Sequence, residues 1–253
     1  MNDKVKANDI DFYKVVNTGT LDKFIFKWGF KPMKYLKDSY LYPIVSKKDF
    51  NNTFGKTYVG RSKSPKIIIK GLTLLDCAID LLGEFIPGKS TLVVRSNNND
   101  ILTLKAFTVL LNSKLVIFYI KEKYASSSYN GGISFTKHMI NEIPIPSLID
   151  IPMLANVCDL ILKEKKQLQE FIHKNISFIT MKFPEIEVSK INEWHKMSSA
   201  QFIKLLNKSR KLSLKDESEW MIYFNQEQEK AIVLEESINN IDIKFNNSIY
   251  KAY

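Results

Sequence analysis

Short apolar runs separated by glycine and proline fill most of the first hundred residues of the chain. Such runs, bounded by turn-forming residues, are typical of strands joined in hairpins or a β-meander. Residues 11–16 form the first run, and residues 17–20 read as a turn because Asn and Gly tolerate left-handed backbone. Residues 72–82 are leucine-rich enough for a helix, but the short spacing between breakers favours strands. The later predicted strands are residues 66–70, 72–75, 85–86 and 91–95.

Helical periodicity begins after residue 100. Residues 101–124 predict a helix broken near Asn112 and Ser113. Residues 133–135 and 139–143 then return to strand character, and Pro144 and Pro146 end it.

Beyond Pro152, apolar residues recur at three- and four-residue spacing, which is typical of helices that pack on a core or on one another. The predicted helices cover residues 153–179, 199–207 and about 215–237, and Ser213 is expected to cap the last. The pattern therefore predicts an α/β (α+β) fold. A mixed β-sheet domain would occupy residues 1–150, and a helical region that spaces or docks it would occupy residues 151–253.

Net charge distinguishes these two parts. Residues 1–150 hold 22 Lys and Arg against 13 Asp and Glu, whereas residues 151–253 hold 15 against 14. An AT-rich genome would favour lysine in both parts alike, so the difference predicts that a polyanion binds the first. The longest apolar runs fall far short of the ~18 residues of a membrane span. Two isolated cysteines and the lack of an apolar leader favour a reduced, cytoplasmic setting.

Three stretches of the first part are candidate contact surfaces. Residues 55–66 predict a glycine-flexed basic loop, which lacks the GxxxxGK[ST] order of a P-loop. Residues 24–42 interleave aromatic residues with lysines, either to stack bases and pair phosphates or, more commonly, as a small core with solvated lysines between its members. Residues 126–132 are polar, uncharged and glycine-ended, as in a loop that meets another molecule or in an ordinary surface loop.

No catalytic constellation is recognisable. The chain lacks a glycine-rich cofactor loop and the Asn/Asp-Pro-Pro-Tyr/Phe motif of adenine methyltransferases. Asp76 and Asp80 are the nearest candidates for a nuclease metal site, but no correctly spaced (E/D)xK follows, so surface or turn positions are expected for both. The histidines have no evident nucleophile partner. The chain is therefore expected to be non-catalytic, with no cofactor and no metal.

Several short motifs carry a family resemblance through their order. Residues 111–114 (Leu-Asn-Ser-Lys), the glycine turn near residue 131 and residues 143–146 (Ile-Pro-Ile-Pro) resemble the TaqI-like C-terminal specificity domain. This is the target recognition domain of type IIG restriction-modification enzymes, and type I specificity subunits use similar modules. Residues 16–22, 28–29 and 35–37 are similar to the lead-in from an adenine methyltransferase, and residues 219–224 and 249–253 resemble the ends of such enzymes.

The resemblance implies a sequence-specific DNA-binding module that directs an adenine-specific DNA methyltransferase, with or without an endonuclease domain or subunit, to its duplex target. Its loops would face DNA, where Arg, Lys, Asn and Gln read bases and cations hold phosphates. A stand-alone DNA endonuclease with an unrecognised metal site is the alternative, and a basic module for an acidic protein partner is a third reading. The residues expected to contact DNA are Lys56, Arg61, Lys63, Lys66, Lys70, Lys89, Arg95, Ser126, Ser127, Tyr129, Asn130 and Lys137.

Overall fold

The computed structural model describes residues 2–3, 11–125, 128–129, 132–147 and 149–253. It confirms an α+β fold that combines several small sheets with helices. Contacts divide the chain into two compact units: unit 1 comprises Met1–Leu162 and Ile243–Tyr253, and unit 2 comprises Lys163–Asp242. The boundary predicted at residue 150 instead marks the start of a helix that begins in unit 1 and continues into unit 2.

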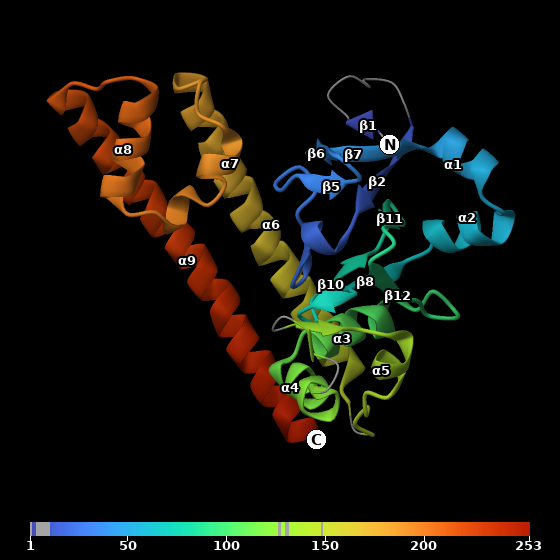
Figure 1. The fold of residues 1–253 in the computed structure, drawn as a ribbon. Coiled ribbons are helices and arrows are strands. Elements are labelled where there is room, and N and C mark those ends of the chain that lie inside the picture. The colour runs from blue at the N-terminus through green and yellow to red at the C-terminus, as the bar shows by residue number, and fades with distance from the viewer. Residues whose placement is uncertain (1, 4–10, 126–127, 130–131, 148) are drawn as a thin grey trace. The chain divides into compact units, whose positions relative to one another are not determined.

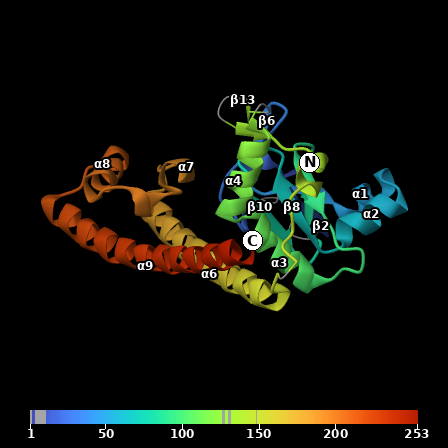
Figure 2. The same ribbon diagram turned by 90° about the horizontal axis from the view of Figure 1, so that it is seen from below.

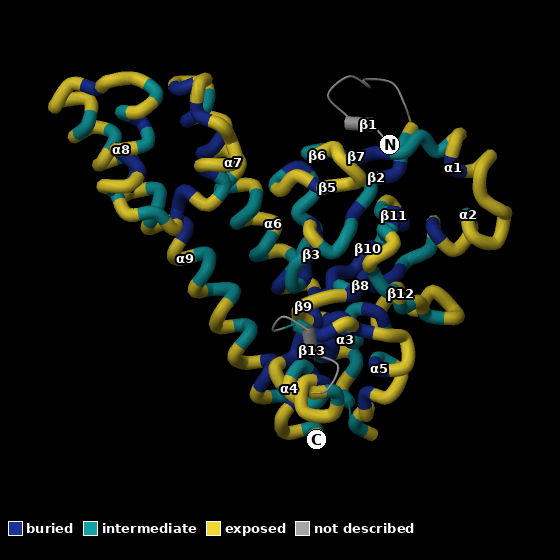
Figure 3. Tube along the Cα trace, viewed as in Figure 1, coloured by how far each residue is buried: buried dark blue, intermediate teal, exposed yellow. Residues whose placement is uncertain are grey.

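A three-stranded antiparallel sheet, here the β8 sheet, forms the centre of unit 1 (Figure 1). Strand β8 (Lys66–Lys70) lies between β10 (Cys77–Asp80) and β12 (Thr91–Val94). Ile67, Ile68 and Ile69 are fully buried, because helices and strands cover both faces of this sheet. Figure 3 shows the resulting run of buried positions in β8 and β10.

A second sheet of unit 1, here the β2 sheet, is mixed. Strand β2 (Phe12–Val16) pairs antiparallel with β7 (Pro43–Ser46) and parallel with β11 (Phe85–Pro87), and β1 (Asn2–Asp3) extends it beyond β7. Side chains alternate along β2, so that Tyr13 packs with α1 and α2 while Val16 packs towards the β8 sheet. The smaller sheets comprise β9 (Leu72–Thr73), β13 (Ser128–Tyr129) and β14 (Gly132–Ser134), β3 (Leu21–Asp22) with β4 (Ile25–Phe26), and β5 (Met33–Tyr35) with β6 (Asp38–Tyr40).

Helices α3 (Ile101–Leu111) and α4 (Lys114–Lys123) confirm the predicted helix with its break, and they meet at 63°. The Asn112 side chain causes the break, since it exchanges hydrogen bonds with the backbone of Cys77 (N–O distances 3.1 and 3.0 Å), and Ser113 caps α4. Among the described residues no single helix has the length and apolar character needed to cross a membrane, although this bent pair together would meet that measure. Unit 1 also contains the 3₁₀ turn η2 (Thr18–Thr20), α1 (Lys47–Thr53), α2 (Lys56–Lys63) and α5 (Lys137–Asn141).

Two local predictions for unit 1 are wrong. Residues 56–63 form helix α2, because Val59 packs partly buried against the β2 sheet, Ser62 is buried, and Pro65 ends the helix only afterwards. Residues 137–141 form the short helix α5, since Thr136 accepts a hydrogen bond from the backbone of Met139 and caps it. The leucine-rich stretch confirms the preference for strands over a helix, since it contains β9 and β10 separated by a turn, and β10 pairs antiparallel with β8.

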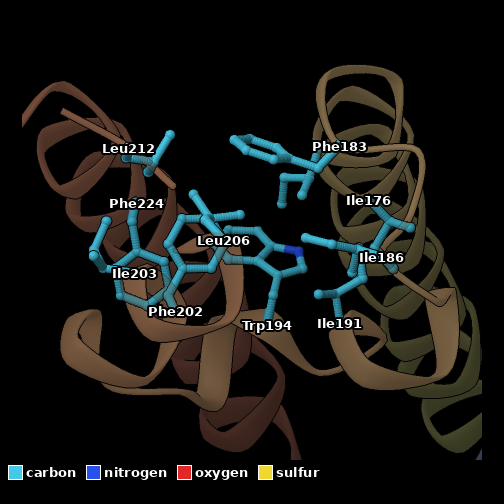
Figure 4. Close-up of a cluster of buried hydrophobic side chains, with 11 residues drawn as sticks. Ile176, Phe183, Ile186, Ile191, Trp194, Phe202, Ile203, Leu206, Leu212 and Phe224 are labelled. Carbon is cyan, nitrogen blue, oxygen red and sulfur yellow. The ribbon is translucent and has the colours of Figure 1, made fainter. Parts of the chain in front are cut away.

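Unit 2 consists of helices around its own core. Helix α6 (Ile151–Lys182) confirms the predicted amphipathic helix, and α8 (Ser199–Ser209) the second; α9 (Leu214–Ala252) begins as predicted after Ser213 but extends fifteen residues past residue 237. The turns α7 (Val188–Ile191) and η4 (Trp194–Lys196) were not predicted. Trp194 is fully buried at the centre of this core, between Ile176, Phe183, Ile186 and Ile191 on one side and Phe202, Ile203, Leu206, Leu212 and Phe224 on the other (Figure 4).

Candidate nucleic-acid interface

Helix α2 presents three of the predicted DNA contacts together. Val59 anchors the helix against Tyr13, Phe50 and Ile86, and the Ser62 hydroxyl donates to the carbonyl of Tyr58 at 2.9 Å. Lys56, Arg61 and Lys63 are exposed. Lys56 and Lys63 flank Val59 on one side of the helix, because they are spaced i, i+3 and i+7, and Arg61 lies on the opposite side. In both ribbon views α1 and α2 project beside strand β2, and Figure 3 shows their outer positions as exposed (Figures 1, 2 and 3).

The cations of α2 remain available to an anion. Lys56, Arg61 and Lys63 form no ion pair with any residue that the structure describes. Arg95 joins them at the end of the helix, since its Nη1 lies 3.3 Å from the hydroxyl of Ser64, the C-cap residue of α2. Four of the predicted contacts therefore gather at one helix and its C-terminal end.

Lys66 is not a surface cation, and burial excludes the predicted contact with DNA. Its side chain is 1% exposed, and Nζ lies 2.6 Å from Oδ2 of Asp80 and 2.8 Å from the carbonyl oxygen of Ser62. The Asp80 carboxylate also accepts from the backbone N–H groups of Glu84 and Phe85 at 3.1 and 3.0 Å. Burial lowers the pKa of Lys66, against the opposing attraction of Asp80.

Lys70 is also held by acids. Its Nζ forms a salt bridge with Asp76 and lies 3.9 Å from Oδ1 of Asp22, with 14% of its side chain exposed. Asp76 and Asp80 are therefore buried partners of lysines, and the prediction that they lie at the surface is wrong. The geometry of strand β8 explains both ion pairs. Lys66 and Lys70 stand at its two ends and point to the same side, because side chains alternate along a strand, and the adjacent β10 region supplies Asp80 and Asp76.

The remaining predicted contacts do not gather at α2. Lys137 is exposed at the start of α5, which lies away from α2 (Figure 1). Tyr129 is the last residue of β13, whereas Ser126, Ser127 and Asn130 lie outside the described residues. Gly132, expected to give the loop its freedom, has a packing role instead, since a Cβ there would lie 2.7 Å from the Cα of Thr73 in the paired strand.

Beside α2 lies a cavity of about 670 Å³, here the aromatic pocket. Its floor is the face of the β2 sheet formed by Val15, Val45 and Ile86, with Phe50 of α1 closing one side. Tyr35, Phe54 and Tyr58 stand around it with 52%, 44% and 46% of their surfaces exposed. Exposed aromatic rings that converge on one hollow are unusual on a folded surface and mark a binding site more often than chance.

The polar groups of the aromatic pocket are few. Asn17 is occupied, because its side chain accepts from the N–H of Gly19 at 3.0 Å and donates to the carbonyl of Lys34 at 3.2 Å. Ser90 accepts from the Thr18 hydroxyl at 3.0 Å. Lys89 is exposed at the edge of the pocket and has no ion-pair partner in the described parts of the chain. Lys89, one of the residues predicted to contact DNA, thus lines the aromatic pocket.

Sequence reasoning missed Phe54 and Tyr58. The closeness of Phe50, Phe54 and Tyr58 in the sequence was the available signal, although they belong to two helices that are separated at Phe54 and Gly55. The rings do pack in series, with centroids 4.7 Å apart for Phe50 and Phe54 and 5.1 Å apart for Phe54 and Tyr58. Reading residues 55–66 as a loop concealed this pattern.

Unit 2 carries a different concave surface, here the α8 groove, of about 440 Å³. Lys204, Leu205 and Lys208 of α8 line it together with Met197, Lys190 and Gln201. Lys190 is paired with Glu187, but Lys204 and Lys208 have no acidic partner among the residues described. Lysines around a floor of Met and Leu suit an acidic surface that also offers apolar side chains.

Metal and thiol chemistry have no candidate among the described residues. No cluster of three or more His, Cys, Asp or Glu side chains in those parts is arranged to hold a metal ion. Cys77 and Cys158 are buried; desolvation raises the pKa of Cys158 to about 12 and also raises that of Cys77. Thiols with such pKa values stay protonated and unreactive at neutral pH.

Comparisons with known proteins concern the helical part of the chain. No curated protein matches the sequence. Residues 151–249 match the family described as "Domain of unknown function (DUF8810)", a range that begins with the first residue of α6 and ends near the end of α9. This match covers less than half of the chain, and it leaves the sheets and helix α2 of unit 1 outside the matched region.

Proposed function

We propose that the chain is a non-catalytic specificity module that binds duplex DNA and directs an adenine-specific methyltransferase, with or without an endonuclease, to its target in the cytoplasm. Unit 1 would contact DNA and unit 2 would dock the catalytic partner. The resemblance of the sequence to TaqI-like specificity domains supports the system to which the module would belong.

The observation that carries the proposal is the set of exposed cations on α2. Lys56, Arg61 and Lys63 are exposed on a helix that packs against the β2 sheet through Val59, and Arg95 lies at its end. Net charge also favours unit 1 as the DNA-binding part, because unit 2 holds 13 Lys and Arg against 13 Asp and Glu, so that the whole net charge of +10 belongs to unit 1. Cations without acidic partners attract DNA phosphates over several ångströms. Binding is then favoured because each neutralised phosphate releases counterions from the DNA.

Docking through unit 2 is supported by the α8 groove. An enzyme that must be brought to DNA needs a protein-facing surface, and this groove combines lysines with Met197 and Leu205. A partly apolar floor favours a protein partner over phosphate, since phosphates need positive charge alone.

The alternative of a stand-alone endonuclease is not favoured, because the two carboxylates first considered for a metal site are paired with lysines. Asp76 and Asp80 neutralise Lys70 and Lys66 inside unit 1. Incubating the purified chain with plasmid DNA and Mg²⁺ or Mn²⁺ tests this alternative directly, and metal-dependent cleavage would contradict the specificity-module proposal.

The central experiment removes the α2 cations. Fluorescence anisotropy with a labelled 20-base-pair duplex should show that Lys56→Ala, Arg61→Ala and Lys63→Ala together weaken binding at least tenfold. They should also reduce the slope of log K against log salt by about 2.7, since each lost phosphate contact accounts for about 0.9.

A matched control removes three exposed lysines of unit 2, through Lys163→Ala, Lys166→Ala and Lys174→Ala. This control lowers net charge equally but should change duplex affinity less than twofold. Equal losses in both triple variants would mean that overall charge, and not α2, holds DNA, and the proposed interface would be wrong.

A further inference from the structure

Leu36 violates two local rules at once. It is 88% exposed, and its φ of +55° is a left-handed conformation that a leucine rarely adopts. It sits with Lys37 in the two-residue turn between β5 and β6, where Tyr35 pairs with Asp38. A turn of this kind favours glycine at the position with positive φ. A large apolar side chain in this strained, exposed position at the tip of a hairpin therefore points to a use for that side chain.

The hairpin tip adjoins the aromatic pocket. Tyr35 is the last residue of strand β5 and directly precedes Leu36 in the sequence, and its ring lines the pocket. On the other side of the pocket, Tyr58 belongs to α2, the helix that carries the exposed cations. Lys34 and Lys37 are exposed as well, so cations flank the apolar tip and the pocket on both sides.

The chemistry of the pocket matches a nucleobase. Tyr35 and Tyr58 offer partly exposed rings for stacking, and every base has a π face to stack on them. Lys89 provides a charge at the edge for the attached phosphate. The volume lies within the range of about 300–1,000 Å³ that small-molecule sites occupy. An aliphatic ligand would leave both the rings and the lysine without a specific role.

We propose that the aromatic pocket takes one nucleobase that has left the stack of the DNA duplex, and that Leu36 enters the gap from which the base departed. The inference rests on the proposed function and extends it. Apolar wedges commonly separate base steps in this way, and stacking of the extruded base on aromatic rings offsets the loss of stacking in the duplex. Lys89 then holds the phosphate of the extruded nucleotide.

A duplex with a single unpaired thymine tests the pocket without knowledge of the target sequence. Such a base is already outside the regular stack, so binding it avoids most of the extrusion cost. The full chain should bind a 20-base-pair duplex with one bulged thymine at least tenfold more tightly than the fully paired duplex. Replacing the nucleotide beside the bulge by fluorescent 2-aminopurine gives a second readout, since its emission changes when its stacking changes.

The variants separate the pocket from the phosphate contacts. Tyr35→Ala with Tyr58→Leu should reduce the tenfold preference to less than twofold and leave affinity for the paired duplex within threefold. Tyr58→Phe keeps the ring and should keep the preference. The α2 triple alanine variant should weaken both duplexes equally and leave the ratio between them unchanged. Circular dichroism and thermal melting confirm that each variant is folded.

The outcomes distinguish this inference from the proposed function. Binding of the paired duplex with no preference for the bulge would overturn the inference alone, as would a preference that survives loss of both tyrosine rings. Tighter binding of free thymidine 5′-monophosphate than of the bulged duplex would make the pocket a nucleotide site and also overturn it. Failure to bind either duplex would remove the proposed function together with the inference.

Discussion

Buried lysine–aspartate pairs fix the ends of strand β8 at the scale of single residues. Lys66 and Asp80 face each other across the β8–β10 pairing, with backbone donors and an acceptor that complete the coordination of both charges. Such a pair adds little net stability over an apolar pair, but the loss of one member leaves the other charge buried and unpaired. These residues therefore matter for folding and not for contact with DNA.

Lys66→Ala should lower the free energy of unfolding by about 3–5 kcal/mol, because Asp80 would then be an uncompensated buried carboxylate. Urea unfolding followed by circular dichroism measures this change. Lys63→Ala is the matched control, since Lys63 is exposed on α2 and should shift stability by less than about 0.5 kcal/mol. A stable Lys66→Ala protein with weakened DNA binding would restore the role first predicted for Lys66.

His195 is the buried titratable residue of unit 2. Its side chain is 5% exposed, Nε2 lies 3.3 Å from Oε1 of Glu235, and Nδ1 has no hydrogen-bond partner among the described residues. Burial lowers the pKa of His195 below its ordinary value of 6.5, and the nearby charge of Lys196 lowers that pKa further. The carboxylates of Glu235 and Glu193 favour the charged imidazole and partly oppose this lowering. The folded protein thus binds a proton less readily here than the unfolded chain does.

Stability should therefore fall as the pH drops from 7 to 5, by at most about 1.4 kcal/mol per pH unit for one proton. The sign follows because the unfolded chain takes up the proton first, once the pH falls below 6.5. The contribution of His195 is the difference between wild type and His195→Asn in urea unfolding at each pH, which removes the effects of groups common to both. A difference that does not change between pH 7 and 5 would contradict the lowered pKa.

At the scale of elements, helix α2 and the β5–β6 hairpin have opposite relations to stability. Helix α2 is held by the packing of Val59 and needs neither of its lysines to fold. The hairpin instead carries a conformational cost at Leu36, whose φ is +55° and whose side chain gains no burial. Strain without compensating packing is a feature that proteins retain mainly at binding and catalytic sites.

Leu36→Asn should stabilise the protein by up to about 1 kcal/mol, because asparagine tolerates left-handed backbone better than leucine does. The same substitution should remove most of the preference for a bulged duplex. Thermal melting and anisotropy on one preparation measure both effects. Loss of stability with DNA preference intact would show that Leu36 serves the fold and is not a wedge.

At the scale of the whole molecule, net charge differs between the two units, as the proposed division of DNA binding and docking requires. All of the net positive charge belongs to unit 1, whereas unit 2 is neutral overall but places on one groove Lys204 and Lys208, which have no acidic partner in the part of the chain that the structure describes. Neutrality of unit 2 limits its long-range attraction for DNA, while the local lysines favour an acidic protein surface.

Lys204→Ala with Lys208→Ala should therefore weaken association with the methyltransferase partner at least tenfold and change the duplex affinity of the chain alone less than twofold. Pull-down of a co-expressed methyltransferase and anisotropy with the 20-base-pair duplex measure the two quantities. The earlier triple control at Lys163, Lys166 and Lys174 serves again. A tenfold loss of duplex affinity would instead show that the α8 groove is part of the DNA-binding surface.

The sequence by itself determined features that depend on local pattern. Apolar periodicity predicted α3, α4, α6 and α8, and the cap at Ser213 placed the start of α9, because helical spacing and capping involve residues within one or two turns. Strands β2, β8, β11 and β12 followed from short apolar runs between breakers. Composition also located the excess positive charge in the first part of the chain.

Only the tertiary structure decided which of the basic residues are accessible. Lys63 and Lys66 look alike in the sequence, but strand pairing puts Asp80 opposite Lys66 while helix α2 turns Lys63 outward. The helical state of residues 56–63 depends on burial of Val59 against the β2 sheet, which overrides the weak helix propensity of Gly60 and its neighbours. The aromatic pocket likewise requires β5, α2 and three strands to meet, and such long-range pairing is not encoded in any local spacing.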